Sequence, residues 1–177
     1  MHDDPKLLRL FYSVRDFQLA LSALIFFQEL DENNKYSNVE LRRFRCYLEC
    51  AIISYSRPFN KSYGMPILKF KDINIEPSTI EKSLHDKIIQ HRNGVVAHSD
   101  TEKIRLLVQS RSIKDDILLP IMTTDEGLDF IDDRDDWIIW LRKLISGLSE
   151  VTFDAIQALE EGTVLHKDYK NPDLSNT

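Results

Sequence analysis

The sequence predicts an all-α protein, an up-and-down bundle of about four long helices with a small β-hairpin inserted after the third. Apolar residues recur at three- and four-residue steps over long segments, which is the period of an amphipathic helix. Two Ser-x-x-Glu capping signals mark the starts of separate helices. Short runs rich in Ile, Leu and Val, bounded by polar residues, lie between residues 103 and 122. Such runs are typical of a hairpin.

The composition is that of one globular domain. The chain has 177 residues, of which 42% are hydrophobic and 29% charged, as in ordinary soluble proteins. We assign residues 1–162 to this domain and expect 163–177 to be a loosely ordered tail. Because we find no signal-peptide pattern and no apolar run of membrane-spanning length, we expect a cytoplasmic location without a membrane partner. Cys46 and Cys50 are then expected to be small buried hydrophobes.

Two long antiparallel helices are predicted in the first third of the chain. The first spans Pro5–Leu30, with Asp4 as its N-cap and proline in the first turn, where a missing N–H costs nothing. The second follows a capping box of Ser37 and Glu40 and ends near Ser56. The core positions predicted for the first helix are Leu7, Leu10, Phe11, Val14, Phe17, Leu21, Leu24 and Ile25, with Tyr12, Leu19, Phe26 and Phe27 widening the buried arc. Those of the second are Val39, Phe44, Tyr47, Leu48, Ala51, Ile52 and Tyr55.

A loop is predicted over residues 58–76, which contain two prolines and a glycine and show no helical period. Its lysines and aromatic residues fit two uses, and the sequence leaves both open. They either contact a phosphate backbone and stack on an unpaired base, or pack across the bundle. These residues are Lys61, Tyr63, Lys69, Phe70 and Lys71.

The third helix is predicted to start at a second capping box, Ser78 and Glu81, and carries the motif described below. Strands are predicted from Lys103 to Val108 and from Ile117 to Met122, with a turn at residues 124–127. Helix is the competing interpretation of these short apolar runs. The acidic stretch at residues 132–136 suits the positive end of a last helix, which we expect to reach about Glu161.

The segment from His91 to Asp100 is the part of the sequence that indicates chemistry. Arg92 is followed directly by Asn93 and, six positions on, by His98. In an unbroken helix six residues rise about 9 Å and leave the two side chains about 120° apart, so they would not meet on one phosphate. Either the helix loosens near Gly94, or a second copy of the chain completes the site about a twofold axis.

The string Arg92-Asn93-Gly94-Val95-Val96-Ala97-His98-Ser99-Asp100 resembles the signature of the HEPN superfamily and is most similar to its abortive-infection U-type branch. The resemblance implies a helical bundle, a homodimer through the motif helix and metal-independent cleavage of RNA without a cofactor. The catalytic residues implied are Arg92, His98 and Asn93. We add His91, Lys87 and Asp100 as candidate substrate-binding residues, and we expect no metal ligands.

These residue types suit the chemistry that the resemblance implies. His98 has an ordinary pKa near 6.5 and is able to take a proton from a 2′-hydroxyl near neutral pH. Arg92 stays charged and offers paired donors to phosphate oxygens, and Asn93 is expected to orient the arginine or a phosphate oxygen.

Several features favour other interpretations. A net charge of −6 opposes general binding of nucleic acid, although Arg42, Arg43, Arg45, Lys82, Lys87 and Arg92 would supply a local basic patch. His91 and His98 also fit partly buried histidines, and Arg92 fits an ion-pair partner of Asp86. The histidine and aspartate spacing fits no common metal-ligand pattern.

The alternative function is a catalytically silent binding or assembly module in a defence or toxin–antitoxin system. HEPN relatives are paired with a nucleotidyltransferase antitoxin that modifies a tyrosine just beyond the motif histidine. This sequence has Ser99 and Asp100 there, which argues against that form of control.

Overall fold

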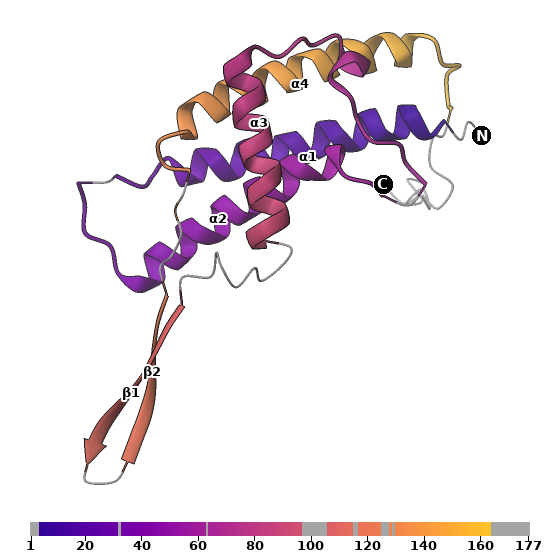
Figure 1. The fold of residues 1–177 in the computed structure, drawn as a ribbon. Helices are drawn as coiled ribbons and strands as arrows, with labels where there is room; N and C mark the ends of the chain where they lie inside the picture. The colour runs from indigo at the N-terminus through magenta and orange to yellow at the C-terminus, as the bar shows by residue number, and fades with distance from the viewer. Residues whose placement is uncertain are drawn as a thin grey trace, which may run out of the picture.

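The computed structural model describes residues 4–31, 33–62, 64–96, 106–114, 117–124, 128 and 130–163. Four long helices make up most of this part of the chain (Figure 1). They are α1 (Pro5–Phe27), α2 (Asn38–Ser56), α3 (Thr79–His91) and α4 (Arg134–Gln157). Short 3₁₀ turns span Arg57–Phe59 and Phe70–Ile73, a π-helical turn spans Arg92–Val96, and two strands, β1 (Leu106–Lys114) and β2 (Ile117–Thr124), precede α4.

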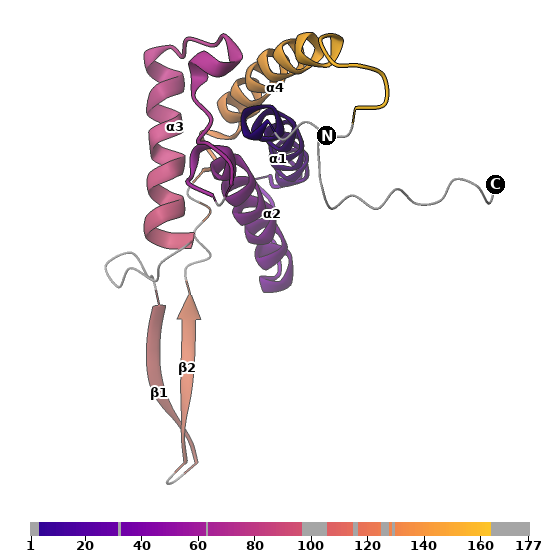
Figure 2. The same ribbon diagram turned by 90° about the vertical axis from the view of Figure 1, so that its right-hand side faces the viewer.

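The helices form one body in which α1 lies between α2 and α4. Helix α2 returns antiparallel to α1, and α4 packs along the other side of α1. Helix α3 crosses this layer steeply and covers one side of it, as Figures 1 and 2 show from two directions. The prediction of a mostly helical protein is therefore confirmed, as is the antiparallel arrangement of the first two helices.

Three helices begin where the sequence predicts. The Asp4 carboxylate accepts hydrogen bonds from the backbone N–H groups of Lys6, at 2.8 Å, and Leu7. Helices α2 and α3 begin with the predicted reciprocal capping boxes. Helix α1, in contrast, ends at Phe27 rather than at the predicted Leu30. The apolar pattern misplaced this end because Leu30, beyond the last turn, is itself buried.

Most of the predicted core positions are buried or half-buried, but four are exposed. They are Leu19 at 43%, Ile25 at 45%, Phe26 at 50% and Val39 at 73%. Val39 lies in the first turn of α2, where fewer neighbouring elements remain to cover it. Leu19 and Phe26 are seven positions apart, so they share one side of α1, and the buried arc of this helix is narrower there than predicted. The predicted positions that are fully buried include Phe17, Leu24, Phe44, Leu48, Ala51, Ile52 and Tyr55, and α4 adds Trp137, Trp140, Leu141 and Leu144 to the same core.

The expectation that no apolar segment approaches membrane-spanning length is wrong for α1. By length and composition alone it is able to cross a membrane, with a mean hydropathy of 1.3 over eighteen residues. Its apolar side chains also serve the core, since Phe17, Leu24 and Phe27 are fully buried. A core helix and a membrane segment share this composition, so the composition alone does not choose between them.

Arg9 fixes the loop that follows α2. Its guanidinium donates to the carbonyl oxygen of Pro66 at 2.7 Å and also to the hydroxyl of Ser62. Arg9 is only 4% exposed, and hydrogen bonds donated by a charged group are stronger than those between neutral groups. The two bonds therefore hold the loop against α1. In the same loop Phe70 packs against Trp140, with ring centroids 5.6 Å apart. This residue packs across the helices, which is one of the two uses predicted for the loop aromatics.

The two cysteines are free thiols on α2. Cys50 is half-buried, but Cys46 is exposed, so the expectation that both are buried is wrong for Cys46. The reason is its position on the outer side of the helix, between Arg42 and Arg43 on one turn and Cys50 on the next.

Strands β1 and β2 pair in antiparallel fashion and form a ribbon that we call the β arm. Leu106 pairs with Thr124 at its base, and the register shifts between Ser112 and Lys114 near its tip. β1 therefore continues beyond the predicted end at Val108. Residues 103–105 and 125–127, at the predicted strand start and turn, lie outside the described residues, as does the predicted tail from residue 164 onward.

Gly147 on α4 gives a test of this packing. A Cβ atom there would lie 2.7 Å from the carbonyl oxygen of Ile73 and 2.8 Å from Cδ1 of Ile75. We therefore expect Gly147→Ala to lower the free energy of unfolding by about 1–3 kcal/mol, despite the higher helix propensity of alanine. Urea denaturation measures this change. Ser146→Ala, at the neighbouring exposed position, should change stability by less than about 0.5 kcal/mol, and equal effects would contradict the packing.

Candidate functional site

The candidate site lies where α3 ends. The α-helical hydrogen-bond pattern of α3 stops at His91, and a π-helical turn follows over Arg92–Val96. A single π turn inside a helical segment is rare and is often found at functional sites. Of the two alternatives left by the sequence, loosening of the helix near Gly94 is thus confirmed. The offset calculated for a straight α-helix no longer applies to Arg92.

Arg92 and Asn93 contact each other at the start of this turn. Nη1 of Arg92 donates to Oδ1 of Asn93 at 3.0 Å, while the backbone N–H of Arg92 bonds to the carbonyl oxygens of Ile88 and Ile89. Arg92 is half-buried and Asn93 is exposed. The amide oxygen therefore holds one guanidinium N–H, and a guanidinium has further donors with which to bind a phosphate.

His91 and Lys87 hold α3 against the segment before α4. The His91 ring meets the buried Phe130 ring edge-on, with centroids 5.1 Å apart. Nζ of Lys87 lies 5.0 Å from the same ring and forms an ion pair with Asp133. Both candidate substrate-binding residues thus have structural contacts as well. No local sequence pattern predicts this pairing, because Lys87 and Asp133 are 46 residues apart.

His98 and Asp100, the remaining predicted site residues, lie outside the described residues. Of the predicted site residues, Lys87 and His91 thus lie in the last turns of α3, and Arg92 and Asn93 lie at the start of the π-helical turn.

A shallow groove of about 520 Å³ follows the outer face of α3. Its lining within the described part of the chain consists of Thr79, Lys82, Ser83, Asp86, Lys87 and Gln90. These positions form one stripe along α3, which runs to the end of the helix where the π-helical turn begins. The groove thus leads towards the π-helical turn. Its walls carry both charges, because Asp86 lies between the two lysines.

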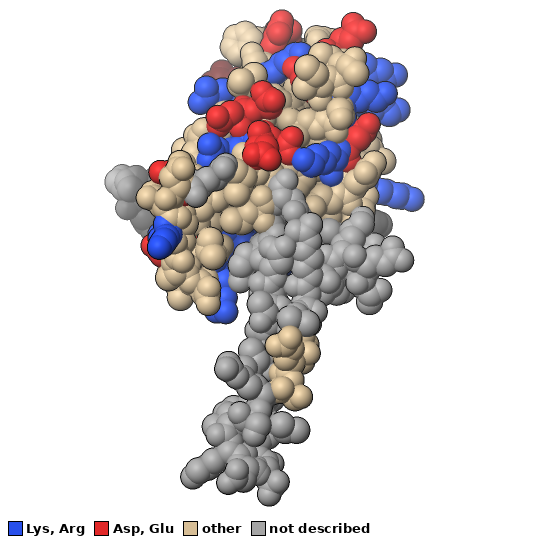
Figure 3. All heavy atoms as spheres, turned by 60° about the vertical axis from the view of Figure 1, so that its left-hand side comes forward, with Lys and Arg blue, Asp and Glu red and all other residues tan. Residues whose placement is uncertain are grey.

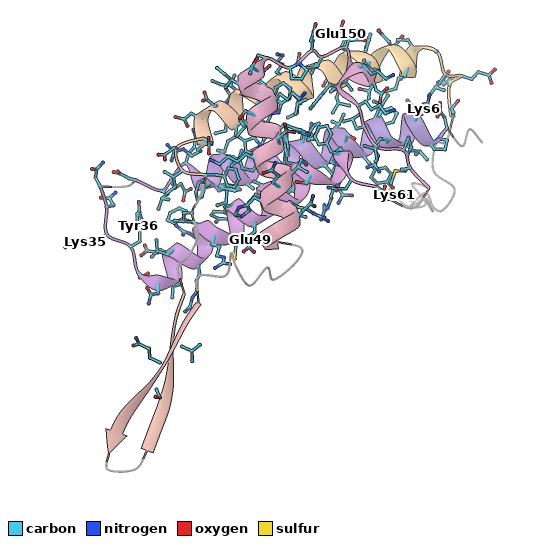
Figure 4. The ribbon with its side chains drawn as sticks, in the orientation of Figure 1. Lys6, Lys35, Tyr36, Glu49, Lys61 and Glu150 are labelled. Atoms are coloured by element: carbon cyan, nitrogen blue, oxygen red, sulfur yellow. The ribbon has the colours of Figure 1, made fainter. Side chains whose placement is uncertain are left out.

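Carboxylates accompany many cations of the predicted basic patch. Arg45 donates to Glu49 at 2.9 Å, and Arg43 lies 3.7 Å from Glu29. Figure 4 labels Glu49, the acidic member of the first pair, on α2, the helix that also contacts the π-helical turn. On the face shown in Figure 3, acidic and basic side chains of the described residues are interspersed. Such a surface gives a local and weak field rather than broad attraction for polyanions.

His85 is a half-buried residue of α3 with aromatic and hydroxyl neighbours. Its Nδ1 lies 2.9 Å from the hydroxyl of Tyr55, and the same hydroxyl accepts a hydrogen bond from Nε1 of Trp140 at 2.7 Å. The rings of Phe59 and Phe70 lie 4.6 and 5.0 Å from the imidazole. Among the described residues, no three His, Cys, Asp or Glu side chains form a metal-binding group.

The direction of these hydrogen bonds fixes the tautomer of His85. Indole N–H only donates, so the Tyr55 oxygen accepts it, and the Tyr55 proton must go to an acceptor. His85 Nδ1 serves as that acceptor only in the neutral Nε2–H form. Burial lowers the pKa of His85, and the nearby Asp86 opposes this effect. Burial likewise raises the pKa of Tyr55, which keeps its hydroxyl protonated.

Stability should therefore depend on the charge of His85. Because its pKa in the folded protein lies below the ordinary value of 6.5, the unfolded chain binds more protons between the two values. The stabilisation is complete above about pH 6.5 and is lost as the pH falls below it. We expect His85→Asn, which keeps an acceptor near the Nδ1 position, to flatten this loss in urea denaturation series from pH 7.5 to 5.

His91→Asn is the matched control on the same helix, and it should retain the loss of stability at low pH. If His85→Asn and the wild type lose the same stability over this range, the hydrogen-bond chain does not control the pH dependence.

Comparison of the chain with protein-family models, with curated proteins and with solved structures finds no match.

Proposed function

We propose that this protein is a metal-independent endoribonuclease of the HEPN type. The observation that carries the proposal is the Arg92–Asn93 pair on a π-helical turn at the end of α3, six positions before His98. Asn93 holds the guanidinium of Arg92 where the α-helix gives way to the π-helical turn. An arginine held in this way is suited to binding a phosphate in one orientation.

The fold supports the proposal at a coarser level. Among the described residues the motif lies at the end of the third of four long helices, as predicted for a HEPN-like bundle, although α3 crosses the other helices steeply instead of running along them. Within this proposal the β arm is a hairpin inserted between the motif and the last helix. The domain covers residues 1–162 and acts as a cytoplasmic homodimer, with the motif helices of the two copies adjacent.

The proposed reaction needs only the residues of the chain and the RNA itself. His98 removes the proton from a ribose 2′-hydroxyl, and the 2′-oxygen attacks the adjacent phosphorus. The bond from phosphorus to the 5′-oxygen breaks, and the leaving oxygen takes a proton from water. Arg92 stabilises the negative charge that builds up on the phosphorane oxygens, while Asn93 holds the guanidinium. The products are a 2′,3′-cyclic phosphate and a 5′-hydroxyl.

The other predicted residues have supporting roles in this proposal. His91, Lys87 and Asp100 border the site and position the RNA backbone. Lys87 is 51% exposed despite its pair with Asp133, so its ammonium group is accessible to a phosphate. DNA lacks the internal nucleophile and is not a substrate.

A second function is favoured by the charges. The net charge is −6, and Arg43, Arg45 and Lys87 all lie beside carboxylates. These pairs suit a silent HEPN module that binds a protein partner in a defence or toxin–antitoxin system, such as a nucleotidyltransferase antitoxin. In that case a stoichiometric partner co-purifies, and the isolated protein cleaves no RNA.

The ribonuclease proposal is tested with purified protein, mixed RNA and EDTA. We expect cleavage by the wild type and a loss of at least about 100-fold in rate for Arg92→Ala and for His98→Ala, because a positioned acid–base or charge-stabilising group contributes this much. Arg92→Lys should be intermediate, since lysine keeps the charge and loses the paired donors. Gel electrophoresis and end-group analysis give the rate and the product ends.

Arg15→Ala is the control, because Arg15 is exposed on α1 and its loss changes the net charge equally. It should cleave like the wild type. Cleavage that requires added metal, persists in both site variants or extends to DNA would refute the mechanism. Absence of any cleavage would favour the silent module.

A further inference from the structure

The β arm projects from the helical body without covering it. Figures 1 and 2 show β1 and β2 extending away from the helices in both views. Val108 on β1 is 56% exposed, and Gln109 and Ser110 are also exposed. An isolated two-stranded ribbon is only marginally stable in water and gains stability when further strands join it. The arm therefore presents an interaction surface.

Pro120 reveals which backbone groups face outward. It pairs with Ser110, and proline has no N–H to donate to the partner strand. The Ser110–Pro120 pair must then be one in which the backbone polar groups point away from the partner strand. Pair types alternate along an antiparallel ladder. The Val108–Met122 pair, two positions away, consequently also has its N–H groups on the outer edges.

The two outer edges of the ribbon differ. On β1, Leu106, Val108, Ser110 and Ser112 each have an outward N–H, and the register stays regular until the shift after Ser112. On β2, Pro120 interrupts the row of donors. Natural proteins use proline in this way to block pairing along an edge. Each chain thus has one complete edge, the β1 stretch from residue 106 to 112.

We propose that β1 pairs with β1 of a second copy of this chain, antiparallel about a twofold axis at Gln109. With the axis at Gln109, the regular stretch of β1 in one copy pairs with the same stretch in the other copy. Leu106 then stands opposite Ser112, and Val108 stands opposite Ser110. The result is a four-stranded sheet with β2 of each copy on the outside. Twofold pairing uses the same edge from both chains and closes at two copies, and the blocked edge of β2 stops further growth.

The register also sets the direction and the spacing of the two copies. Position 111 stands opposite position 107 of the second copy, and the two arms point in opposite directions. The two Leu106 residues lie six positions apart along the sheet, or about 20 Å. This pairing sets the two helical bodies at opposite ends of the four-stranded sheet, so the dimer held by β1 is an alternative to the motif-helix dimer of the proposed ribonuclease. It does not depend on the ribonuclease chemistry, and Arg92→Ala should pair like the wild type.

Two proline variants of one residue pair test the proposal. Val108→Pro removes the outward donor of β1, which the proposed interface uses twice. Met122→Pro removes the outward donor of β2, which it does not use. Analytical ultracentrifugation of the full chain without RNA should show a dimer for the wild type and for Met122→Pro. The dissociation constant of Val108→Pro should be at least tenfold higher.

A cysteine at the twofold axis gives a second measurement. The Gln109 residues would form a non-hydrogen-bonded pair with Cα atoms about 4.5 Å apart, a separation that a disulfide spans. In a Cys46→Ser, Cys50→Ser background, Gln109→Cys should form a disulfide-linked dimer on oxidation, and adding Val108→Pro should abolish it. Circular dichroism verifies that the helices remain folded.

A monomeric wild type at about 100 μM would overturn the proposal. It would equally be overturned if Val108→Pro dimerised as tightly as the wild type, or if Met122→Pro dissociated as much as Val108→Pro.

Discussion

A single buried hydroxyl group, that of Tyr55, connects three of the long helices. It lies on α2, accepts a hydrogen bond from Trp140 on α4 and meets the imidazole of His85 on α3. Its ring also lies 5.8 Å from that of Phe17 on α1. A buried polar group left without a partner costs about 1–3 kcal/mol. The position of α3 along α2 is therefore fixed by the hydrogen bond between Tyr55 and His85, since a shift of α3 by one turn would break it.

Helix α3 needs this kind of attachment because it buries few apolar side chains. Among the described residues of α3, the buried ones are Leu84 and Ile88. Polar contacts supply the rest: Glu81 binds Lys143 at 2.8 Å, and Lys87 binds Asp133. These contacts follow one another along the helix up to His91. The π-helical turn that carries Arg92 thus begins at a point that the body of the protein holds in place.

The sequence predicted the features that depend on residues close together in the chain. The caps at Asp4, Ser37 and Ser78 were correct because a cap involves only the next three residues. The contact between Arg92 and Asn93 was also within reach, since the two residues are adjacent. The helical fold was predicted from the period of the apolar residues, because this period shows which face of each helix is apolar.

The features that remained hidden depend on how helices cross. Tyr55 and His85 are 30 residues apart, and Trp140 is farther still along the chain. Periodicity does not define the angle at which α3 crosses α2 and α4, so these partners have no signal in the sequence. The same holds for Gly147, whose close contact with Ile73 depends on where one loop meets α4. Leu30 shows the converse. Its apolar side chain led to the prediction of a longer helix, but a residue is able to be buried without being helical, and Leu30 is buried beyond the end of α1.

The packing of α1 between α2 and α4 has a consequence for synthesis on the ribosome. One apolar side of α1 packs against α2, which is made soon after it, but the other side packs against α4, which is made only with residues 134–157. At about 5–20 residues per second, the ribosome needs on the order of ten seconds to make the intervening chain. During that time a helix apolar enough to suit a membrane is only half covered. The nascent chain thus passes through a stage at which chaperones and membrane-targeting factors compete for the same segment.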